Sequence, residues 1–574
     1  MLNKIKLCNQ SLTDTALTFD VQPINIFVGS NNSGKFLFLQ ELYLYLNHGR
    51  IAENRFKIID QIQVQPYNDE ESNSFLKKNT YLDTSDFDTS NYISFNPEFK
   101  HIQRVSEDKV KEALKNPEDL SQDELNNYRF EFIEGPQTLL INGQNRLNSF
   151  DSMPWSVSRT PGNSRDYKEH IIDLLRENPE NNERFKSIIQ DAFNKYIGVM
   201  YDGGYAQFVL SDIPIPLEYD MSLSVEATQF YNNCDKGINV SDGIKAYTGI
   251  VSKIISAEAS NILIDEPEAF LHPHLARKLG KVIANLSVDE KKEIYISTHS
   301  ADFIMGCIES NTPINIIRVG YDNRIATANL IDSSTLTELM RNPLFRSVNV
   351  IDGLFYKNVI VTEADSDRAF YQEINTRLKD YKPEWHIDDC LFLNAQNKQT
   401  VGPIVKLLRS VGVPAVSLID FDLIKDGGSV FFKYLSSVNI PESLLHSIAD
   451  KKTRIKDGFP KPENGKYPSN SEIKTKGIHY LEENSPQDLY LTAISMINDI
   501  NQYGLFPVPY GELESWLPEI EADTHGNGWL IKKFESMGNN PQLSSYVKPY
   551  DGDVWLFMKN IKSWLDDVDR KGMV

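Results

Sequence analysis

Two short apolar runs that end in acidic residues constrain the fold of this chain most strongly. Glu363 and Asp367 follow the first run, in NVIVTEADSD, and Asp420 and Asp422 follow the second, in VSLIDFDLI. Each run is typical of a buried strand, and open α/β sheets bind their ligands at the carboxyl ends of the strands. Neighbouring carboxylates cannot both ionise cheaply unless a cation neutralises them. Oxygen ligands without nearby Cys or His favour Mg²⁺ or Mn²⁺, so the sequence predicts a divalent-metal site on an α/β fold.

The segments around these runs alternate between strands and helices. YKNVIVTEADSDRAFYQEINTRL contains a strand, an acidic turn and an amphipathic helix. CLFLNA then supplies a second strand, VGPIVKLLRSVG a second helix and PAVSLIDFDLI a third strand. This β-α-β alternation is typical of a parallel sheet. Later in the chain, LFPVPYGELESWL predicts another apolar strand, which is followed by Glu512 and Glu514.

The acidic positions resemble the Toprim domain of topoisomerases, primases and OLD-family nucleases. Glu363, followed later by Asp420 and Asp422, carries this resemblance. It implies phosphodiester chemistry with two metal ions, Mg²⁺ or Mn²⁺, that clamp the attacking and leaving oxygens of a scissile phosphate. The implied ligands and catalytic acids are Glu363, Asp420 and Asp422 at the first ion, and Asp367 with Glu512 or Glu514 at the second. The resemblance also implies a lysine downstream of GELE that steadies the transition state, for which the candidates are Lys532, Lys533 and Lys548.

A glycine-rich loop near the N-terminus predicts a nucleotide site. GSNNSGKF follows the apolar run INIFV and precedes the helix-like LFLQELYLYL. It fits the P-loop pattern G-x-x-x-x-G-K-[ST], in which backbone N–H groups and a lysine bind phosphates, except that Phe36 replaces the hydroxyl residue that ligates Mg²⁺. The predicted phosphate-binding residues are Gly29, Asn31, Asn32, Ser33, Gly34 and Lys35. We therefore expect ATP to bind, with hydrolysis slow or absent.

Three later segments strengthen the nucleotide prediction. NILIDEPEAFLHP is an apolar strand that ends in Asp265 and Glu266, where one acid holds the Mg²⁺ shell and the next orients the attacking water. IYISTHSADFI places His299 just after a strand, and this position matches the switch histidine of ABC-type ATPases. NVSDGIKAYTGI resembles a degenerate ABC signature, in which Ser241 and Gly243 would contact the nucleotide of a partner subunit. The resemblance therefore implies a homodimer or a higher oligomer.

The spacing of the motifs predicts two domains. We expect an ABC-type ATPase domain over residues 1–345, with a helical or dimerisation segment inserted at about 45–235, and a Toprim domain with a C-terminal helical extension over 346–574. Helices are predicted in the insertion from SEDKVKEALKN, QDELNNYRFEFI, SRDYKEHIIDLLREN and NNERFKSIIQDAFNKYI. INIIRVGYD and RIATANL should be the last strands of the ATPase domain. Residues 333–351 are predicted to be a linker or a helical bridge.

The amino-acid composition limits the compartment, the kinds of site and the partners that we expect for this protein. No apolar run is long enough to span a bilayer and the N-terminus lacks a signal-peptide core, so we expect a cytoplasmic protein without membrane contact. The 4 cysteines lack CxxC spacing, which argues against a zinc site and a disulfide framework. The net charge of −21 does not exclude DNA as a partner, because net charge says little about a local groove. The lysine-rich stretch 450–476 predicts a mobile loop that either binds DNA or is simply solvated.

The whole chain resembles the OLD family, in which an ABC-type ATPase is fused to a Toprim nuclease. The nuclease subunit of Gabija and the OLD effectors associated with retrons share this order. The resemblance implies an ATP-regulated, metal-dependent DNA endonuclease of bacterial anti-phage defence. The implied partners are DNA, a second copy of the chain, and either a helicase subunit or a reverse transcriptase with its noncoding RNA.

Other functional classes remain open. A RecF-type or SMC-type repair ATPase shares the P-loop, the signature and the DEPE motif, but neither class explains DFD, and SMC proteins need long heptad arms that this sequence lacks. A topoisomerase shares the Toprim acids but needs a nucleophilic tyrosine in a separate cleavage domain. A nucleotide-sensing scaffold without nuclease turnover is consistent with Phe36. Cleavage of DNA that depends on a divalent cation distinguishes a nuclease from the scaffold.

Overall fold

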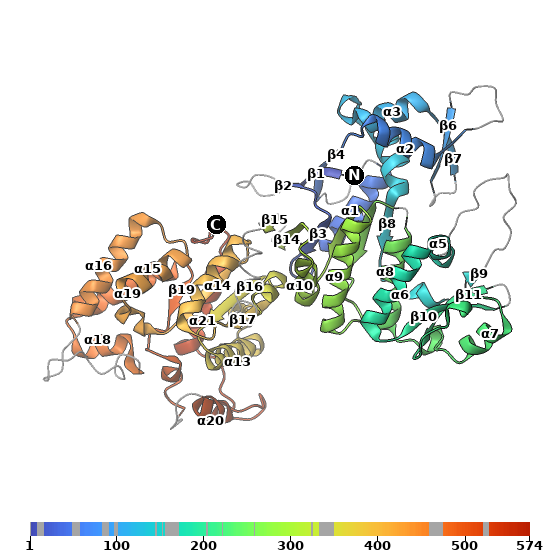
Figure 1. Cartoon of the computed structure of the whole chain (residues 1–574). Helices are drawn as coiled ribbons and strands as arrows, with labels where there is room; N and C mark the ends of the chain where they lie inside the picture. The colour runs from blue at the N-terminus through green and yellow to red at the C-terminus, as the bar shows by residue number, and fades with distance from the viewer. Residues whose placement is uncertain are drawn as a thin grey trace. The chain divides into compact units, whose positions relative to one another are not determined.

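The computed structural model describes most of the chain, which folds into two compact units (Figure 1). Residues 1–28 and 32–330 form the first unit, and residues 29–31 and 331–574 form the second. Residues 333–348 of the predicted linker at 333–351, and residues 459–474 of the lysine-rich stretch, with Lys461, Lys466 and Lys474, lie outside the described residues. The described residues are 2–7, 17–48, 58–82, 91–96, 101–143, 146–151, 153–154, 171–202, 205–220, 222–257, 259–322, 325–331, 349–458, 475–520 and 527–573.

The first unit is built on a six-stranded sheet with the strand order β15-β14-β3-β13-β12-β8. Its strands are β3 (Ile24–Val28), β8 (Thr138–Ile141), β12 (Asn261–Asp265), β13 (Glu293–Ser297), β14 (Ile314–Asp322) and β15 (Ile325–Ile331). β3 pairs in parallel with β13 and β14, and β12 pairs in parallel with β13 and β8. Buried parallel strands read as continuous apolar runs, which explains the composition of INIFV and NILI. The predicted final strands, INIIRVGYD and RIATANL, are confirmed as β14 and β15.

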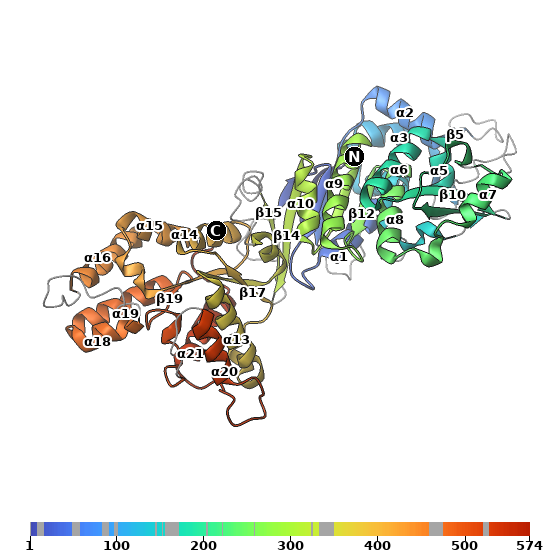
Figure 2. The same cartoon turned by 60° about the horizontal axis from the view of Figure 1, so that its bottom comes forward.

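Helices pack against this sheet and against one another (Figures 1 and 2). α1 (Lys35–His48) follows β3 and contacts β8, β12 and β13. α8 (Asp242–Ser256) packs on α9 (Pro273–Asp289), which in turn packs on α10 (Ala301–Glu309). The rings of Phe27 in β3 and Phe38 in α1 stack with their centroids 3.8 Å apart inside a buried cluster. This contact fixes the end of β3 relative to the first turn of α1, and therefore the two ends of the loop between them.

Smaller sheets and helices make up the rest of the first unit. The antiparallel strands are β1 (Leu2–Leu7), β2 (Thr18–Asp20) and β4 (Ile59–Val64) in one sheet, β5 (Thr80–Leu82), β6 (Asn91–Asn96) and β7 (His101–Ser106) in another, and β9 (Met153–Pro154), β10 (Tyr196–Asp202) and β11 (Tyr205–Ser211) in a third. The helices are α2 (Asp69–Asn79), α3 (Glu107–Lys115), α4 (Gln122–Glu124), a π-helix (Leu125–Glu134), α5 (Ile171–Glu177), α6 (Pro179–Phe193) and α7 (Val225–Asn232). Three of the four predicted helices therefore appear, as α3, as α4 with the π-helix, and as α6. Of the fourth, SRDYKEHIIDLLREN, residues 171–177 form α5, and residues 164–170 lie outside the described residues.

The residues at the two ends of α6 explain why this predicted helix forms. The side chain of Asn178 accepts a hydrogen bond from the backbone N–H of Asn181 at 3.1 Å, and Pro179 occupies the first turn, as at many helix starts. The helix ends at Phe193, and the C-cap residue Asn194 adopts a left-handed conformation with φ +53°. Residues 196–197 of the predicted helix instead begin β10.

The second unit contains a fully parallel four-stranded sheet with the order β17-β16-β18-β19. Its strands are β16 (Asn358–Thr362), β17 (Cys390–Asn394), β18 (Ala415–Ile419) and β19 (Leu505–Pro507). α13 (Asp365–Tyr381) connects β16 to β17, and α14 (Lys398–Ser410) connects β17 to β18. The predicted β-α-β alternation is therefore confirmed. β16 and β18 are buried along their whole length, and Glu363 and Asp420 directly follow them at the carboxyl edge of the sheet.

Further helices follow β18 and β19 in the chain. They are α15 (Gly428–Ser437), α16 (Glu442–Gly458), α18 (Ile478–Asn484), α19 (Gln487–Asn501), α20 (Asn527–Met537) and α21 (Asp553–Asp566). Across the part of the chain that the structure describes, no helix is both long and apolar enough to cross a lipid bilayer.

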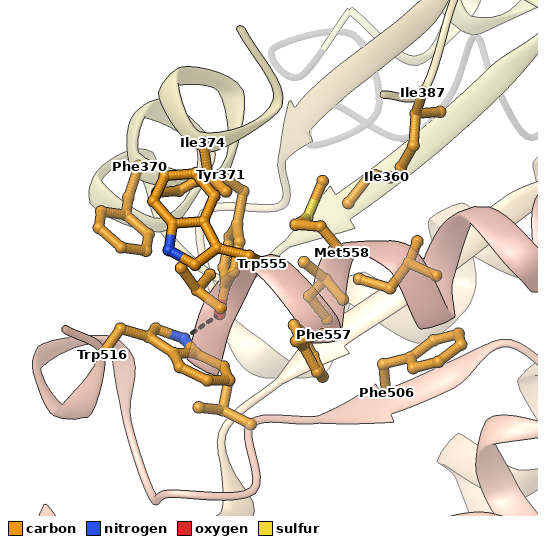
Figure 3. Packing of buried hydrophobic residues seen from close by; sticks show 14 of the residues in the cluster. Ile360, Phe370, Tyr371, Ile374, Ile387, Phe506, Trp516, Trp555, Phe557 and Met558 are labelled. Carbon is orange, nitrogen blue, oxygen red and sulfur yellow. Dashed lines mark hydrogen bonds between the residues drawn. The ribbon is translucent and has the colours of Figure 1, made fainter. Parts of the chain in front are cut away.

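An aromatic core ties the segment after β19 to α13 (Figure 3). The indole N–H of Trp516 donates a hydrogen bond to the hydroxyl of Tyr371 at 2.9 Å, and its ring lies 5.2 Å from that of Phe557, centroid to centroid. Trp516 comes two residues after Glu514, and Tyr371 lies one helical turn after Asp367. The core therefore holds two acid-bearing segments at fixed places in the second unit.

The prediction of a mobile loop at 450–476 is wrong for residues 450–458, which belong to α16. The Lys451 ammonium lies 2.5 Å from a carboxylate oxygen of Asp499, and the Arg454 guanidinium lies 2.5 Å from that of Asp488. Both acids belong to α19, so the basic residues of α16 follow a helical repeat that faces a neighbouring helix. Charge and turn-forming composition favoured a loop, but pairing with α19 stabilises a helix, which could not be read from the segment alone.

Candidate functional sites

The P-loop turns between the end of β3 and the start of α1, as predicted. Gly29, Asn32 and Gly34 have positive φ angles of +150°, +61° and +97°. The Lys35 side chain is buried, and its ammonium donates to the hydroxyl of Ser33 at 3.4 Å. The loop thus comprises the predicted phosphate-binding residues Gly29, Asn31, Asn32, Ser33, Gly34 and Lys35 ahead of a helix N-terminus, the local structure that binds phosphates in P-loop proteins.

β13 pairs with β3, the strand that leads into this loop, and β12 pairs with the other side of β13. Asp265 ends β12, and its carboxylate accepts a hydrogen bond from the hydroxyl of Ser297, its register partner at the end of β13. The imidazole Nε2 of His299 lies 4.0 Å from Oε1 of Glu266. Burial lowers the pKa of His299, and the nearby charge of Lys35 lowers it further. The structure therefore brings Lys35, Asp265, Glu266 and His299 to one edge of the sheet.

Arg146 is a buried residue of this edge that the sequence analysis missed. Its guanidinium Nη1 donates to the carbonyl oxygen of Asp265 at 3.2 Å and also to that of Glu266. Glu266 adopts a positive φ of +46°, which is uncommon for a residue with a side chain, so Arg146 holds a strained turn in place. Arg146 follows β8, the strand next to β12, and this neighbour relationship cannot be read from sequence spacing.

Glu268 is a second residue that sequence reasoning missed in the DEPE turn. Its carboxylate accepts the backbone N–H of His299 at 2.8 Å, which links the DEPE turn to the second residue after the end of β13. Burial raises the pKa of Glu268.

The proposed signature opens a helix, as predicted. Ser241 precedes the first residue of α8, and Gly243 lies in its first turn. A Cβ at Gly243 would meet the carbonyl oxygen of Phe270 at 2.8 Å, so glycine permits α8 to pack closely on the turn after DEPE. The contact of Ser241 and Gly243 with a nucleotide in a partner subunit stays a prediction. His272 precedes the first residue of α9.

The acids of the second unit meet at the carboxyl edge of its sheet. The Glu363 carboxylate accepts the backbone N–H of Asp420 at 3.0 Å, which connects the end of β16 to the end of β18. The Asp367 carboxylate accepts the backbone N–H of Ala364 at 3.0 Å, as part of the cap of α13. The backbone N–H of Phe421 donates to the carbonyl of Gly511 at 2.9 Å, which places the turn that carries Glu512 and Glu514 beside DFD.

The raised pKa values of two of these acids show that the carboxylates of the site are crowded together. Burial raises the pKa of Glu363 to about 7, and the charges of Asp422 and Asp367 contribute in the same direction. Burial also raises the pKa of Asp367 to about 6, with a further contribution from the charge of Glu514. Both carboxylates are therefore held where their ionised forms are poorly solvated and repelled by neighbouring acids.

Lys398 and Asp426 complete the site and were not predicted. Lys398 is the first residue of α14 and forms an ion pair with Asp422, and its ammonium lies 3.0 Å from a carboxylate oxygen of Asp426. These charges raise the pKa of Lys398 despite its burial. α14 begins at the carboxyl edge of the sheet after β17, where ligand-binding residues gather, and this position was the sequence signal for Lys398.

The three lysines proposed downstream of GELE have other surroundings. Lys533 is buried, and its ammonium donates to the carbonyl oxygens of Leu517 at 2.7 Å and Ile520 at 2.9 Å. The ammonium of Lys548 lies 5.2 Å from the ring centroid of Tyr381. Lys532 is exposed on α20. Through these contacts Lys533 connects α20 to the backbone at Leu517 and Ile520.

The donor set fits a divalent cation. Carboxylate oxygens are the ligands that Mg²⁺ and Mn²⁺ prefer, and a bound cation would relieve the crowding that raises the pKa values of Glu363 and Asp367. Within the described residues, no three His, Cys, Asp or Glu side chains are already arranged to hold a metal ion. Coordination would therefore require the carboxylates to close around the ion.

The raised pKa of Glu363 predicts a pH dependence of stability without metal. Because the folded state binds this proton more tightly than the unfolded state, the site contributes stability below pH about 4.5, and that contribution is lost as the pH rises through about 7. We expect the unfolding free energy of the wild type to fall, relative to that of Glu363→Gln, between pH about 5 and about 7. Denaturant unfolding of both proteins in EDTA measures this difference. Parallel pH profiles would contradict the assigned environment of Glu363.

Comparison with known proteins identifies part of the second unit. The family model described as the TOPRIM domain of overcoming lysogenization defect protein-like proteins matches residues 354–422. The chain is 22% identical over 298 residues to the Old nuclease of Escherichia phage P2, a match that spans 48% of each protein. It is 25% identical over 114 residues to the phosphonates import ATP-binding protein PhnC of Stutzerimonas stutzeri, over 18% of this chain and 41% of that protein. The chain thus spans about half the length, or less, of these curated relatives.

Among solved structures, an Smc head bound to the C-winged helix domain of ScpA covers 59% of this chain and 99% of its own, with 13% identity and a TM-score of 0.34. The first unit itself has the predicted P-loop after β3, in a sheet whose strands β14, β3, β13, β12 and β8 pair in parallel. The predicted fold class, an N-terminal ABC-type ATPase fold followed by a Toprim domain, is confirmed. Residues 354–422 form an OLD-like TOPRIM domain, and the chain is related to the OLD-family nucleases, as its sequence predicted.

Proposed function

We propose that this chain is an ATP-binding, divalent-metal-dependent endonuclease that cleaves DNA with its TOPRIM site. The observation that supports this most directly is the meeting of Glu363, Asp367 and Asp420 at one sheet edge, with two of these acids destabilised in their charged forms. Groups whose pKa values are strongly perturbed by burial and by specific neighbours gather at functional sites. The similarity to the Old nuclease supports the same chemistry.

The protein's own residues prepare the site for a phosphodiester. Divalent cations held by Glu363 with Asp420 and Asp422, and by Asp367 with Glu512 or Glu514, would stabilise developing charge and lower the pKa of a bound water. The backbone N–H of Asp420 fixes the orientation of the Glu363 carboxylate, and the cap of α13 fixes that of Asp367. Asp420 sits at the tip of a rigid strand, so it can orient the attacking water or bind metal without moving the backbone.

The nucleotide site has a regulatory role in this proposal. Lys35 and the loop ahead of α1 bind the phosphates of ATP, whereas Phe36 lacks the hydroxyl that usually ligates Mg²⁺. ATP would then act mainly through occupancy, by shifting a conformational equilibrium, rather than through rapid turnover. A homodimer or higher oligomer, with Ser241 and Gly243 completing the partner's site, fits this role.

The wider role proposed is that of an effector in bacterial anti-phage defence, on the basis of the OLD relationship. A Gabija-like system would supply a helicase subunit as partner, and a retron would supply a reverse transcriptase with its noncoding RNA. A nucleotide-sensing scaffold is the second candidate, and it is favoured by the departure at Phe36.

A plasmid assay separates the two candidates. Purified protein is incubated with supercoiled DNA and Mg²⁺ or Mn²⁺, with an EDTA arm and with single-stranded DNA and RNA in parallel. Nicked or linear DNA only in the presence of the cation supports the nuclease. Intact DNA in every arm, with or without ATP, would support the scaffold.

A further inference from the structure

An aromatic residue, Tyr510, lies in the turn that follows β19 at the carboxyl edge of the second unit's sheet. It directly precedes Gly511, whose carbonyl oxygen accepts the backbone N–H of Phe421, the middle residue of DFD, at 2.9 Å. Tyr510 also precedes Glu512 by two residues, which an extended backbone spans in at most about 7 Å. That length is about two base steps of a stacked DNA strand. A phosphate bound by the acids would therefore have the neighbouring nucleotides within reach of Tyr510.

The imidazole ring of His479 stacks on the ring of Tyr510, with the two centroids 4.7 Å apart and an angle of 7° between the ring planes. His479 belongs to α18, and its side chain is 51% exposed. Its Nδ1 lies 3.0 Å from a carboxylate oxygen of Glu482, three residues later in the same helix, and this contact orients the ring. Tyr510 covers one face of the imidazole, so a further ring can stack on the exposed side.

Backbone contacts fix the start of α18 against the turn that contains Tyr510. The backbone N–H of Ile478 donates to the carbonyl oxygen of Pro509 at 2.8 Å. Gly477, just before the helix, has a φ of +50°, and a Cβ at this position would collide with the backbone nitrogen of Gly511. Glycine therefore permits α18 to approach the turn closely enough for the two rings to stack.

The stack is also anchored in the aromatic core of the second unit. The ring of Trp516 meets that of Tyr510 edge to face, with 5.3 Å between their centroids. Trp516 in turn donates its hydrogen bond to Tyr371 of α13 (Figure 3). Because the rings are already held in place, a ligand that stacks on them loses little side-chain entropy. The imidazole of His479 is therefore the outer layer of a supported aromatic platform.

Electrostatic attraction around this platform is weak. Lys476, which precedes α18, forms an ion pair with Glu483 at 2.7 Å. The two side chains are 50% and 57% exposed, so water screens their charges. Any contribution of the platform to nucleic-acid binding should therefore come from its rings, since stacking between a base and an aromatic side chain does not require a charge.

We propose that the stacked rings of His479 and Tyr510 bind an unpaired base of the DNA substrate, next to the phosphate that the acids hold. The inference rests on the proposed function, which identifies the acids as the nuclease centre, and it specifies single-stranded or locally unpaired DNA as the substrate class. Bases inside a duplex are covered by their neighbours and must leave the stack to reach such a platform. Every base has a π-face, so the platform accepts any sequence.

Equilibrium binding to two strands of equal backbone charge tests this inference. Single-stranded oligothymidylate and a strand of abasic deoxyribose phosphates of the same length are titrated with the full-length protein in Ca²⁺, and a gel confirms that both strands stay intact. His479→Ala should bind the oligothymidylate about 5-fold to 100-fold more weakly than the wild type, and the abasic strand within about 2-fold of it. His479→Phe keeps a ring and should bind both strands within about 3-fold of the wild type.

Two controls separate stacking from a structural effect. His446, exposed on α16, supplies the matched variant, and His446→Ala should bind both strands within about 2-fold of the wild type. The oligothymidylate annealed to its complement should bind to His479→Ala and to the wild type with affinities within about 2-fold of each other. Thermal melting checks that each variant is folded.

Three results would each overturn the inference. They are unchanged binding of oligothymidylate by a folded His479→Ala, equal losses for the two strands, and a His479→Phe that binds as weakly as His479→Ala. None of them bears on the proposed function, which plasmid cleavage by the wild type tests separately. A wild type that does not cleave any DNA with Mg²⁺ or Mn²⁺ would overturn the proposed function, whatever the strand-binding result.

Discussion

Glu363→Gln and Asp420→Asn should each lower the rate of DNA cleavage by about 10³-fold, because metal-assisted charge stabilisation contributes several kcal/mol to the transition state. The two acids lie at the ends of neighbouring strands and are joined by a hydrogen bond of 3.0 Å from the backbone N–H of Asp420 to the Glu363 carboxylate. The amide of Gln can still accept this hydrogen bond but cannot bind a cation as a carboxylate does. Initial rates of plasmid nicking under saturating Mn²⁺ measure the loss.

Two controls separate chemistry from folding in these variants. ATP binding should be unchanged, because the P-loop connects β3 and α1, and β3 belongs to a different sheet from β16 and β18. The unfolding free energy of Glu363→Gln near pH about 7 should equal or exceed that of the wild type, since the variant removes a carboxylate that is costly to ionise. Wild-type cleavage by either variant would contradict the assignment of the acids.

Lys35→Ala should weaken ATP binding by about 10-fold to 100-fold, since a hydrogen bond to a charged group contributes about 1.5–3 kcal/mol. The ammonium is buried at the start of α1, so water replaces it poorly. Glu266→Gln should bind ATP with an affinity close to that of the wild type, because this carboxylate serves hydrolysis and not phosphate binding. If occupancy alone regulates the nuclease, only Lys35→Ala should abolish the effect of ATP on cleavage. Equilibrium binding of a fluorescent ATP analogue, together with ATP-dependent cleavage, measures both effects.

Phe36→Ser provides the converse experiment. The Phe36 side chain is 46% exposed, so replacing it leaves no core cavity and restores a hydroxyl at the usual Mg²⁺ position. Hydrolysis should rise while nuclease output stays level or falls. Brisk hydrolysis by the unmodified protein, or loss of function in Glu266→Gln, would show that turnover and not occupancy controls the enzyme.

The local elements of both units could be predicted because their signals are local. The buried runs INIFV, NILI and VSLI form β3, β12 and β18, since fully covered parallel strands need continuous apolar residues. The acids that follow these runs also reach the predicted sheet edges. Their position depends only on the direction of the strand, which the order of acids and apolar residues specifies.

The residues that were missed depend on which strands and helices become neighbours. Arg146 reaches the DEPE turn only because β8 lies beside β12, and Lys398 reaches Asp422 only because α14 begins next to the end of β18. The sequence around the basic residues of α16 predicts a loop, because the acidic residues that pair with them lie on α19, in a later segment of the chain. Single-sequence patterns carry no information about such pairs. Lone charged residues therefore remained ambiguous until the fold placed their partners.

The most direct test of the central claim compares two neighbouring aspartates of α13 in one cleavage assay. Asp365 is 68% exposed and pairs with Arg368, whereas Asp367 is partly buried beside Glu363 and Glu514. Both substitutions to Asn change one acid in the same helical turn, so net charge and helix-terminal electrostatics change alike. If the TOPRIM edge is the nuclease centre, Asp365→Asn should nick supercoiled plasmid in Mn²⁺ within about 2-fold of the wild-type rate, and Asp367→Asn should lose at least about 100-fold. Equal rates for the two variants, or cleavage that persists in EDTA, would contradict it.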